Sequence, residues 1–487
     1  MTFRGPFRPH LNPRAIGLVV GLITVVGLSS LLISRAATPF LSLEPESGAL
    51  NGMATPVTDP TASGGKAIRF NTTTTHTFVH PGITISKTDL DFVRSKVTAH
   101  AEPWTSELQF AASSSYASTS RAPSPMTDLS SSALEATFMN DAQTAYTNAL
   151  LWYYTGNTAY ATQAIRYLNA YATTHTRITF KSSSGSVVYG NGVLDAAWGA
   201  ELWPRTAEII RYSDAGWSPA DATRFETYLK NVYQQLLIDG WTNGGNWQSS
   251  IAEGLINIGV YNNDEATYQA GLSRWKDKIV TSIYLTTDGQ YPIPPSSTYK
   301  RPGDSGWNAT NDIGRMWSYP ARYVDGLVLD TCRDLSHAAM NLAAVTAGAE
   351  TAYIQGDDLY TPYQSRLQRA IELQAGWINA YFDEVHDVAN TVVGSNWMPA
   401  NNWPCRWFMT DALNNTTPVQ NPKNNAGGGA LSMGWDIGFN HYAQRKGISM
   451  PQTRILVDRV LAHKSSAGTY RVGNHVAWTT LTHTGAP

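Results

Sequence analysis

The chain contains few charged residues for its length. Only 15% of its 487 residues are Asp, Glu, Lys or Arg, and 35 basic against 37 acidic side chains leave a formal charge of −2. Binding to a phosphate backbone needs an excess of Lys and Arg, so this balance argues against a nucleic-acid-binding protein. We therefore expect no nucleic acid among its partners.

Cysteine is also scarce, because the sequence contains only Cys332 and Cys405. Outside the cytoplasm these two residues could form one disulfide, and otherwise they are two buried thiols. The sequence leaves both alternatives open. No CxxC or HxxH pair is present, so we expect no metal site.

Aromatic and uncharged polar residues are abundant instead, including 16 Trp and 24 Tyr. Proteins that handle carbohydrates often have this composition, since flat aromatic faces pack on sugar rings and amides bond to sugar hydroxyls. Many of these aromatic residues would simply fill the core, for which the 42% of hydrophobic residues provide ample material.

The N-terminal segment has the pattern of a targeting sequence. Arg4, Arg8 and Arg14 precede residues 15–34, an uncharged run long enough to span a bilayer. The small residues of SRAATP, which follow, could form a cleavage site. We expect residues 1–37 to be a signal peptide or membrane anchor, and the protein to be secreted or anchored to the outer face of the cell membrane.

Residues 38–79 are predicted to be an extension and linker. The sequence FLSLEPESGALNGMATPVTDPTASGGKAIRF has alternating apolar residues near its ends, and NTTTTHT follows it. LEPESG and ASGGKAIRF resemble the first and last strands of a β-sandwich carbohydrate-binding module. The stretch is too short for a complete sandwich, so it could equally be a spacer with β character.

From about residue 84 the sequence has the periodicity of α-helices. Apolar residues recur at three- and four-residue spacing in residues 144–171, 196–212, 220–238, 248–261, 268–284, 335–353 and 363–382. These helices come in pairs of similar length separated by Gly- and Asn-rich loops. The pattern predicts an all-α domain over residues 80–487, an α/α toroid made of an incomplete ring of helical hairpins.

Two predicted helices begin with unusual polar chemistry. In TCRDLSHAAM, a helix starting at Arg333 would place Arg333, His337 and Asn341 on one face, although His337 could be an ordinary interior histidine. In NGGNWQSS, Asn246 could either cap the helix or form a sugar subsite with Trp247 and Gln248.

Two further stretches carry possible substrate contacts. The long segment 288–326 contains Tyr299, Arg301, Trp307 and Tyr323 among other aromatic and basic residues. Loops of this length are often functional and this one would suit an anionic polymer, or it could be packed by its own aromatics. In the glycine-rich segment 427–453, Trp435 and His441 are predicted to line the same cleft.

Three of these stretches, in their order along the chain, resemble the alginate lyase superfamily of α/α-toroid polysaccharide lyases. They are GNWQSSIAEGLINIGVY, YVDGLVLDTCRDLSHAAMNLAAVTAGAETAYIQGDDLY and GWDIGFNHYAQRKGISMP, and the resemblance covers roughly residues 80–465. It implies cleavage of a uronic-acid polysaccharide, of the alginate or glucuronan type, by β-elimination without a cofactor. In that reaction a neutralised carboxylate stabilises the enolate-like transition state, a base takes the C5 proton and an acid protonates the C4 oxygen.

The resemblance also implies roles for individual residues. Asn246 would neutralise the substrate carboxylate with support from Arg333, and His337 is the first candidate for base or proton relay. The tyrosine expected in such lyases would be Tyr323 or Tyr299. The chain departs from the well-known alginate lyases at two positions, with Trp247 where they place a histidine and Met340 where relatives can carry a tyrosine.

Two alternatives to a lyase remain open from the sequence. A glycoside hydrolase on a similar ring would need two carboxylates, which Asp325, Asp330, Asp334 or Glu253 could supply. A non-catalytic surface protein would bind glycans through Trp and Tyr without shortening them. In each case we expect a monomer that binds an acidic polysaccharide and meets a membrane only through its N-terminal segment.

Overall fold

The computed structural model describes residues 54–59, 62, 65–70, 76–181, 187–240, 245–295, 311–318, 320–333, 335–384, 404–405, 408–409, 418–419, 434–462 and 478–487. The predicted targeting segment lies outside the described residues. The chain divides into two compact units, Met1–His76 and Thr77–Pro487. Among the helices that the structure describes, none has the length and apolarity needed to cross a membrane.

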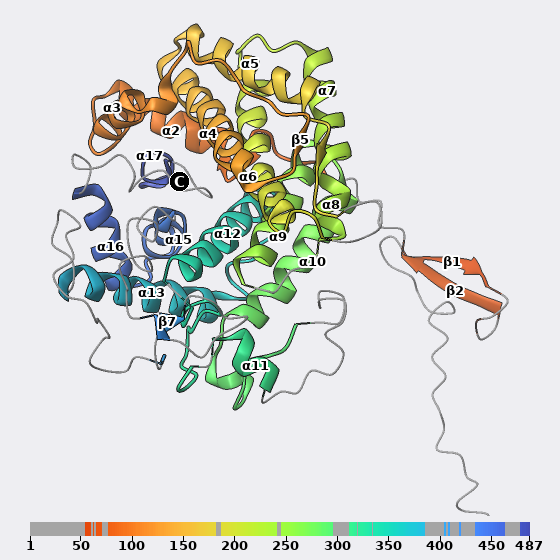
Figure 1. The fold of residues 1–487 in the computed structure, drawn as a ribbon, viewed down its shortest axis with the longest axis vertical. Helices are drawn as coiled ribbons and strands as arrows, with labels where there is room; N and C mark the ends of the chain where they lie inside the picture. The colour runs from red at the N-terminus through yellow and green to blue at the C-terminus, as the bar shows by residue number, and fades with distance from the viewer. Residues whose placement is uncertain are drawn as a thin grey trace, which may run out of the picture. The chain divides into compact units, whose positions relative to one another are not determined.

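The first unit contains a two-stranded antiparallel sheet. β1 (Ala54–Thr58) pairs with β2 (Lys66–Phe70), and the register sets Ala54 opposite Phe70 (Figure 1). β2 is the KAIRF part of the module-like sequence, so this stretch has the β character that was predicted. Its resemblance to a carbohydrate-binding module stays a prediction.

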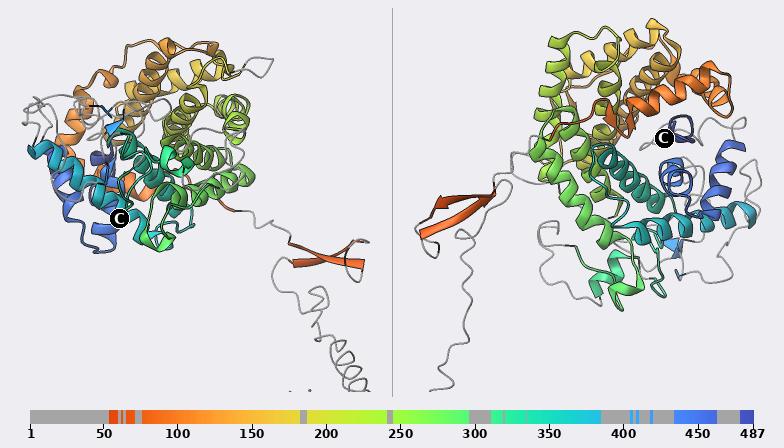
Figure 2. Two further views of the ribbon diagram at one scale, coloured as in Figure 1. Left: turned by 60° about the horizontal axis from the view of Figure 1, so that its bottom comes forward. Right: turned by 180° about the vertical axis from the view of Figure 1, so that it is seen from behind.

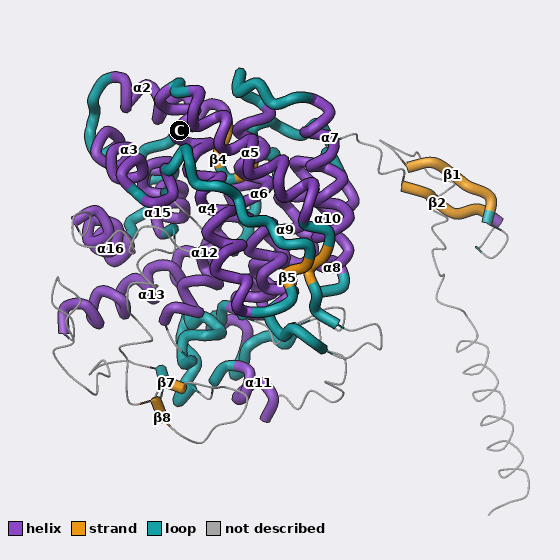
Figure 3. Tube along the Cα trace, turned by 45° about the horizontal axis from the view of Figure 1, so that its top comes forward, coloured by secondary structure: helices purple, strands orange, loops and turns teal. Residues whose placement is uncertain are grey.

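The second unit is mainly helical (Figure 3). Its longer helices are α2 (Lys87–Thr98), α3 (Trp104–Ser113), α4 (Ser132–Thr155), α5 (Thr158–Thr174), α6 (Gly192–Arg211), α7 (Pro219–Tyr228), α9 (Asn246–Tyr261), α10 (Glu265–Ser282), α12 (Leu335–Ile354), α13 (Gln364–Glu384) and α16 (Pro451–Ala462). Shorter helices are α8 (Gln235–Ile238), α11 (Asn311–Met316), α15 (Trp435–Phe439) and α17 (Thr479–His483), and π-helical turns at Leu229–Gln234 and Asn440–Arg445 extend α7 and α15. The strands β3 (Gly82–Ile83), β4 (Ile85–Ser86), β5 (Asp128–Leu129), β6 (Arg177–Ile178), β7 (Phe408–Met409) and β8 (Pro418–Val419) form two-residue pairs.

The helices of this unit form two layers of a ring. α4, α6, α9 and α12 pack against one another in chain order, α15 follows α12, and α17 and α2 connect α15 back to α4 (Figures 1 and 2). α5, α10 and α13 cover α4, α9 and α12 from outside. The fold is therefore an α/α toroid. The ring of hairpins is incomplete, because short helices rather than a long hairpin close it.

Burial explains why the helices separate into two layers. In α6 every residue from Gly192 to Ile210 is buried, and in α9 only Trp247 is partly exposed. A helix that is buried all round must lie among other helices. α13 instead buries one face, which includes Leu367 and Ile371, and exposes residues such as Arg369 on the other.

Residues 144–171, predicted as one helical stretch, belong to two helices. Gly156 ends α4 with a left-handed φ of 70°, and the Asn157 side chain caps α5 by accepting from the Ala159 N–H. Glycine tolerates this backbone conformation, so the chain can reverse direction here and form the α4–α5 hairpin.

Candidate active site

The inner helices run parallel, so their first turns lie at the same end of the ring. Near the start of α9 and α12, the Ser249 hydroxyl donates to Asn341 Oδ1 at 2.6 Å. Two to three turns further along these helices, the Thr351 hydroxyl donates to Asn257 Oδ1 at 3.2 Å. The polar stretches noted in the sequence begin at these first turns, and the fold therefore gathers them at one end.

Asn246 is the first residue of α9, and Gly245 occupies the capping position. The alternative that Asn246 caps this helix is therefore wrong. The Asn246 N–H donates to Asp330 Oδ2 at 3.2 Å, and the residue is 2% exposed. A Cβ on Gly245 would lie 2.1 Å from Asp330 Oδ2, so only glycine lets this carboxylate reach the helix end.

Asp330 also holds the segment that carries Arg333. The Arg333 N–H donates to the Asp330 carbonyl oxygen at 2.9 Å, and α12 begins only at Leu335, so the helix start predicted at Arg333 is two residues early. The buried Lys278 of α10 lies near this carboxylate. Burial lowers the pKa of Lys278 to about 8, although the charges of Asp330 and Asp277 act in the opposite direction.

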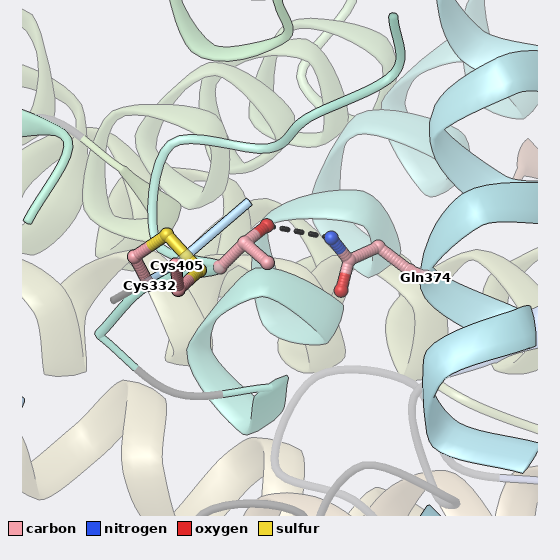
Figure 4. The surroundings of a disulfide bond; sticks show 4 residues. Cys332, Gln374 and Cys405 are labelled. Carbon is pink, nitrogen blue, oxygen red and sulfur yellow. Dashed lines mark hydrogen bonds between the residues drawn. A yellow bond between two sulfur atoms is a disulfide. The ribbon is translucent and has the colours of Figure 1, made fainter. Parts of the chain in front are cut away.

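The turn before α12 is fixed by two further interactions, which Figure 4 shows. Cys332 and Cys405 form a disulfide, which answers the question that the sequence left open. The Gln374 amide of α13 donates to the Thr331 hydroxyl at 2.6 Å. Because these residues directly precede Arg333, they restrict where its backbone can lie.

His337 lies in the first turn of α12 and is half-buried. Residues 340 and 341 share its helix face, and both contact α9. Met340 Sδ lies 3.8 Å from Asn246 Nδ2, and Asn341 accepts from Ser249. The structure therefore brings together the starts of α9 and α12, and with them the backbone positions of Asn246, Arg333 and His337.

The predicted substrate-binding residues have different surroundings. Trp247 is partly buried against the core, and Gln248 is 3% exposed. Trp435, 5% exposed, is the first residue of α15 and lines a small hollow between α12 and α13 with Leu342 and Ile371. Trp247 and Trp435 thus lie at the first turns of inner helices.

His441 lies in the core and is 1% exposed. Its ring stacks on Tyr360 with 3.6 Å between centroids and meets Tyr353 edge-on at 5.0 Å. Burial and the nearby cations of Arg445 and Lys446 lower its pKa to about 3, so the imidazole is neutral. This environment is that of a structural histidine.

Of the two tyrosine candidates, the structure describes only Tyr323. Tyr323 belongs to an aromatic cluster, with ring centroids 5.3 Å from Tyr284, 6.2 Å from Tyr291 and 5.8 Å from Trp317. Burial raises the pKa of Tyr323 to about 12. Tyr299, Arg301 and Trp307 lie outside the described residues.

Three of the four carboxylates considered for a hydrolase are engaged in structural interactions. Glu253 of α9 forms a buried ion pair with Arg205 of α6. Asp325 pairs with Arg369 at 2.7 Å on the surface, and Asp330 holds Asn246. Asp334 lies outside the described residues.

The sequence reasoning missed one polar pair at the same end of the ring. The Tyr189 hydroxyl donates to Asp195 Oδ2 at 2.5 Å. Both residues flank the start of α6, in YGNGVLD. A tyrosine and an aspartate on either side of a glycine-containing helix start were the available signal. In the described residues, no group of three or more His, Cys, Asp or Glu side chains is arranged to hold a metal ion.

A ring of helical hairpins with an amide, an arginine and a histidine at one end defines a class of carbohydrate-active α/α toroids. Comparison with protein families identifies the class more closely, because the alginate lyase family matches residues 117–381, more than half of the chain. The chain belongs to the alginate lyase family. No curated protein matches it.

Solved structures of alginate lyases are similar to this chain. Alginate lyase A1-III from Sphingomonas species A1 is 15% identical, with a TM-score of 0.44, over 64% of this chain and 81% of that one. An alginate lyase from Bacteroides ovatus is 12% identical, with a TM-score of 0.48, over 83% of this chain and 100% of that one. A variant of A1-III complexed with a tetrasaccharide is 16% identical, with a TM-score of 0.43 and the same coverage as A1-III itself.

Proposed function

We propose that this polysaccharide lyase cleaves an alginate-type uronic-acid polysaccharide by β-elimination at the common end of its inner helices. One observation carries the proposal. Asp330 accepts from the N–H of Asn246 through its carboxylate and from the N–H of Arg333 through its carbonyl group. The backbones of Asn246 and Arg333, which carry an amide and a guanidinium group, are thereby held by a single residue.

These two groups meet the first demand of the reaction. The C5 proton of a uronate is only weakly acidic while the neighbouring carboxylate keeps its charge. Hydrogen bonds from the Asn246 amide and the Arg333 guanidinium would neutralise that charge and stabilise the enolate-like transition state. The planar fork of Arg333 suits a carboxylate, since it can donate two parallel hydrogen bonds.

Proton transfer completes the reaction. The C5–H bond breaks and its proton passes to a base, while its electron pair forms the C4–C5 double bond. The C4–O4 bond then breaks, and O4 leaves with a proton from an acid. We assign the base, or the relay to it, to His337, because histidine is the side chain that most often transfers protons in enzyme active sites.

The two departures from the family pattern matter for the acid. Trp247 replaces a histidine, and an indole N–H only donates hydrogen bonds. Met340 replaces a tyrosine, and a thioether has no proton to give. The acid must therefore be another residue, and Tyr323 and Tyr299 stay predictions for that role. Substrate binding by Trp247, Gln248, Arg301, Trp307 and Trp435 is likewise part of this proposal.

We also propose that the protein is a monomer that is secreted or anchored to the outer face of the cell membrane. The uncharged run 15–34 behind three arginines supports this placement. The disulfide supports it independently, because such bonds persist mainly in oxidising compartments.

The experiment is to incubate the purified protein with alginate, glucuronan and a neutral polysaccharide while recording ultraviolet absorbance. A lyase creates a C4–C5 double bond, so absorbance should rise with an acidic polymer and stay flat with the neutral one. New reducing ends without absorbance would indicate a hydrolase. Binding without either signal would indicate a glycan-binding protein. Both of these results contradict the proposal.

A further inference from the structure

Tyr189 and Asp195 form a polar pair for which the site described above has no use. Asp195 is fully buried, and its Oδ1 has no hydrogen-bond partner among the described residues. Tyr189 is 7% exposed and donates to the other carboxylate oxygen. Burying a carboxylate with an unsatisfied oxygen costs stability, so this arrangement suggests a role other than packing.

Contacts between α6 and α9 place the pair near Asn246. Ser250 donates to Glu201, and Arg205 pairs with Glu253, which identifies the faces of the two helices that meet. Asp195 precedes Glu201 by six residues and Asn246 precedes Ser250 by four. Asp195 and Asn246 therefore both lie one to two turns nearer the same end of the ring than the contact between Glu201 and Ser250.

A second contact joins the first turn of α6 to the segment before α9. A Cβ on Gly240, in the segment before α9, would lie 2.9 Å from Val193 Cγ1 in the first turn of α6. The start of α6, with Tyr189 just before it, therefore borders the entry to α9. A sugar carboxylate bound at Asn246 would lie beside this pair.

We propose that Tyr189 is the acid that protonates the departing C4 oxygen, and that Asp195 supplies it with a replacement proton. This inference rests on the β-elimination proposed above. Trp247 and Met340 cannot act as this proton donor. The inference assigns the role to a tyrosine from a different part of the chain.

The proton moves along a short chain during bond cleavage. As the C4–O4 bond breaks, its electron pair stays on O4, which takes the phenolic proton of Tyr189. When Asp195 is a carboxylic acid, it donates to the Tyr189 oxygen, which frees the phenolic proton to point at O4, and it passes its own proton to that oxygen as the phenolic proton leaves. Asp195 regains a proton from solvent, and solvent also removes the proton that His337 took from C5, so the enzyme returns to its starting state.

The surroundings of Asp195 favour the protonated form that this chain requires. Burial raises the pKa of Asp195 to about 7; the hydrogen bond from Tyr189 opposes this rise and the charge of Glu135 adds to it. Among the described residues, Tyr189 and Glu135 of α4 are the titratable groups that face it. If Asp195 were ionised, proton loss from Tyr189 would create two adjacent anions, so kcat should fall as the pH rises through about 7.

The test compares two tyrosine variants of the full chain. Tyr189→Phe should lower kcat on alginate by at least about 100-fold while an oligosaccharide binds within about threefold of its normal affinity. The matched control is Tyr153→Phe, near the C-terminal end of α4. This substitution also removes a tyrosine hydroxyl, one that donates to Asp91 at 2.8 Å. This control should keep kcat within about twofold.

A synthetic uronide whose C4 substituent is a nitrophenyl ether separates the acid role from a structural one. Its leaving group departs without a proton, so Tyr189→Phe should cleave it within about tenfold of the wild-type rate. Asp195→Asn, which keeps the shape of the side chain, should remove the loss of kcat above pH 7.

The proposal is overturned if Tyr189→Phe keeps more than a tenth of the wild-type kcat on alginate. It is also overturned if the defect persists on the nitrophenyl ether, or if Asp195→Asn leaves the pH profile unchanged. These results would leave the lyase assignment intact as long as the wild type forms the unsaturated product. A wild type that forms no such product on any uronide would end both proposals.

Discussion

Gly245 determines whether Asp330 can reach the start of α9. Its backbone has a φ of 61° and a ψ of −147°, which side-chain-bearing residues rarely adopt, and the space beside it is filled by the Asp330 carboxylate. The same carboxylate accepts from the Asn246 N–H. The position of the Asn246 amide therefore depends on the absence of a side chain at residue 245.

We predict that Gly245→Ala lowers the free energy of unfolding by about 2–3 kcal/mol and also lowers kcat, because the new methyl group displaces Asp330. The matched control is Gly156→Ala. Gly156 has a similar φ of 70°, but no atom lies within 4 Å of a Cβ built there. The Gly156→Ala substitution should therefore lower the free energy of unfolding by only about 1 kcal/mol and leave kcat unchanged. Denaturant unfolding and product absorbance measure both effects. Equal losses in the two variants would show that Asp330 does not need this space.

We predict that Arg333→Ala and His337→Ala each lower kcat by at least about 100-fold while the melting temperature changes by only a few degrees. Both residues are half-buried and lie at or just before the start of α12, so the helix can form without them. Arg224→Ala, at an exposed site on α7, serves as the control. Normal activity in His337→Ala would show that the base has been assigned wrongly.

At the scale of elements, α10 brings a buried lysine beneath the site. Lys278 is 3% exposed, and burial lowers its pKa to about 8 from a usual value of 10.5. Between these two values the unfolded state binds a proton that the folded state has lost. The contribution of Lys278 to stability therefore rises as the pH increases from about 8 to 10.5.

We predict that Lys278→Met reduces this rise, so that the free energy of unfolding depends less steeply on pH between about 8 and 10.5 than in the wild type. Lys276→Met is the matched control, because Lys276 is exposed on the same helix. Denaturant unfolding at a series of pH values gives the slopes. If the slope in Lys278→Met equals that of the control, Lys278 does not titrate in this range.

The helices themselves could be predicted largely from the sequence. The expected segment 335–353 corresponds to α12 (Leu335–Ile354), and 248–261 corresponds to most of α9 (Asn246–Tyr261). These helices are long and regular, so their apolar periodicity is easily read. The break at Gly156 was missed because the spacing of alanines and aromatics continues on both sides of it.

The candidate site could be predicted only in part. Family resemblance pointed to Asn246, Arg333 and His337, and these residues lie at or just before the starts of the neighbouring helices α9 and α12. Their roles stay predictions. The connecting role of Asp330 and the Tyr189–Asp195 pair could not be predicted, because they depend on contacts between segments far apart in the chain. His441 was suggested by its polarity, but its place inside an aromatic cluster becomes visible only when helices pack.

At the scale of the whole molecule, the Cys332–Cys405 disulfide joins segments separated by 73 residues. Closing a loop of this length in the unfolded chain should contribute about 4 kcal/mol to stability. We predict that the double variant Cys332→Ala, Cys405→Ala loses about this amount and also lowers kcat, since Cys332 directly precedes Arg333. Unfolding with and without a reducing agent tests this, and an unchanged melting temperature in reductant would contradict it.

The most direct test of the account asks whether Asn246 and Arg333 act by neutralising a sugar carboxylate. The measurement is kcat/KM for the wild type and for Arg333→Ala on a uronate polysaccharide and on its methyl ester, in which the carboxyl group carries no charge. We predict that Arg333→Ala loses at least about 100-fold on the acid polymer but less than about tenfold on the ester. An equal loss on both substrates would contradict the account.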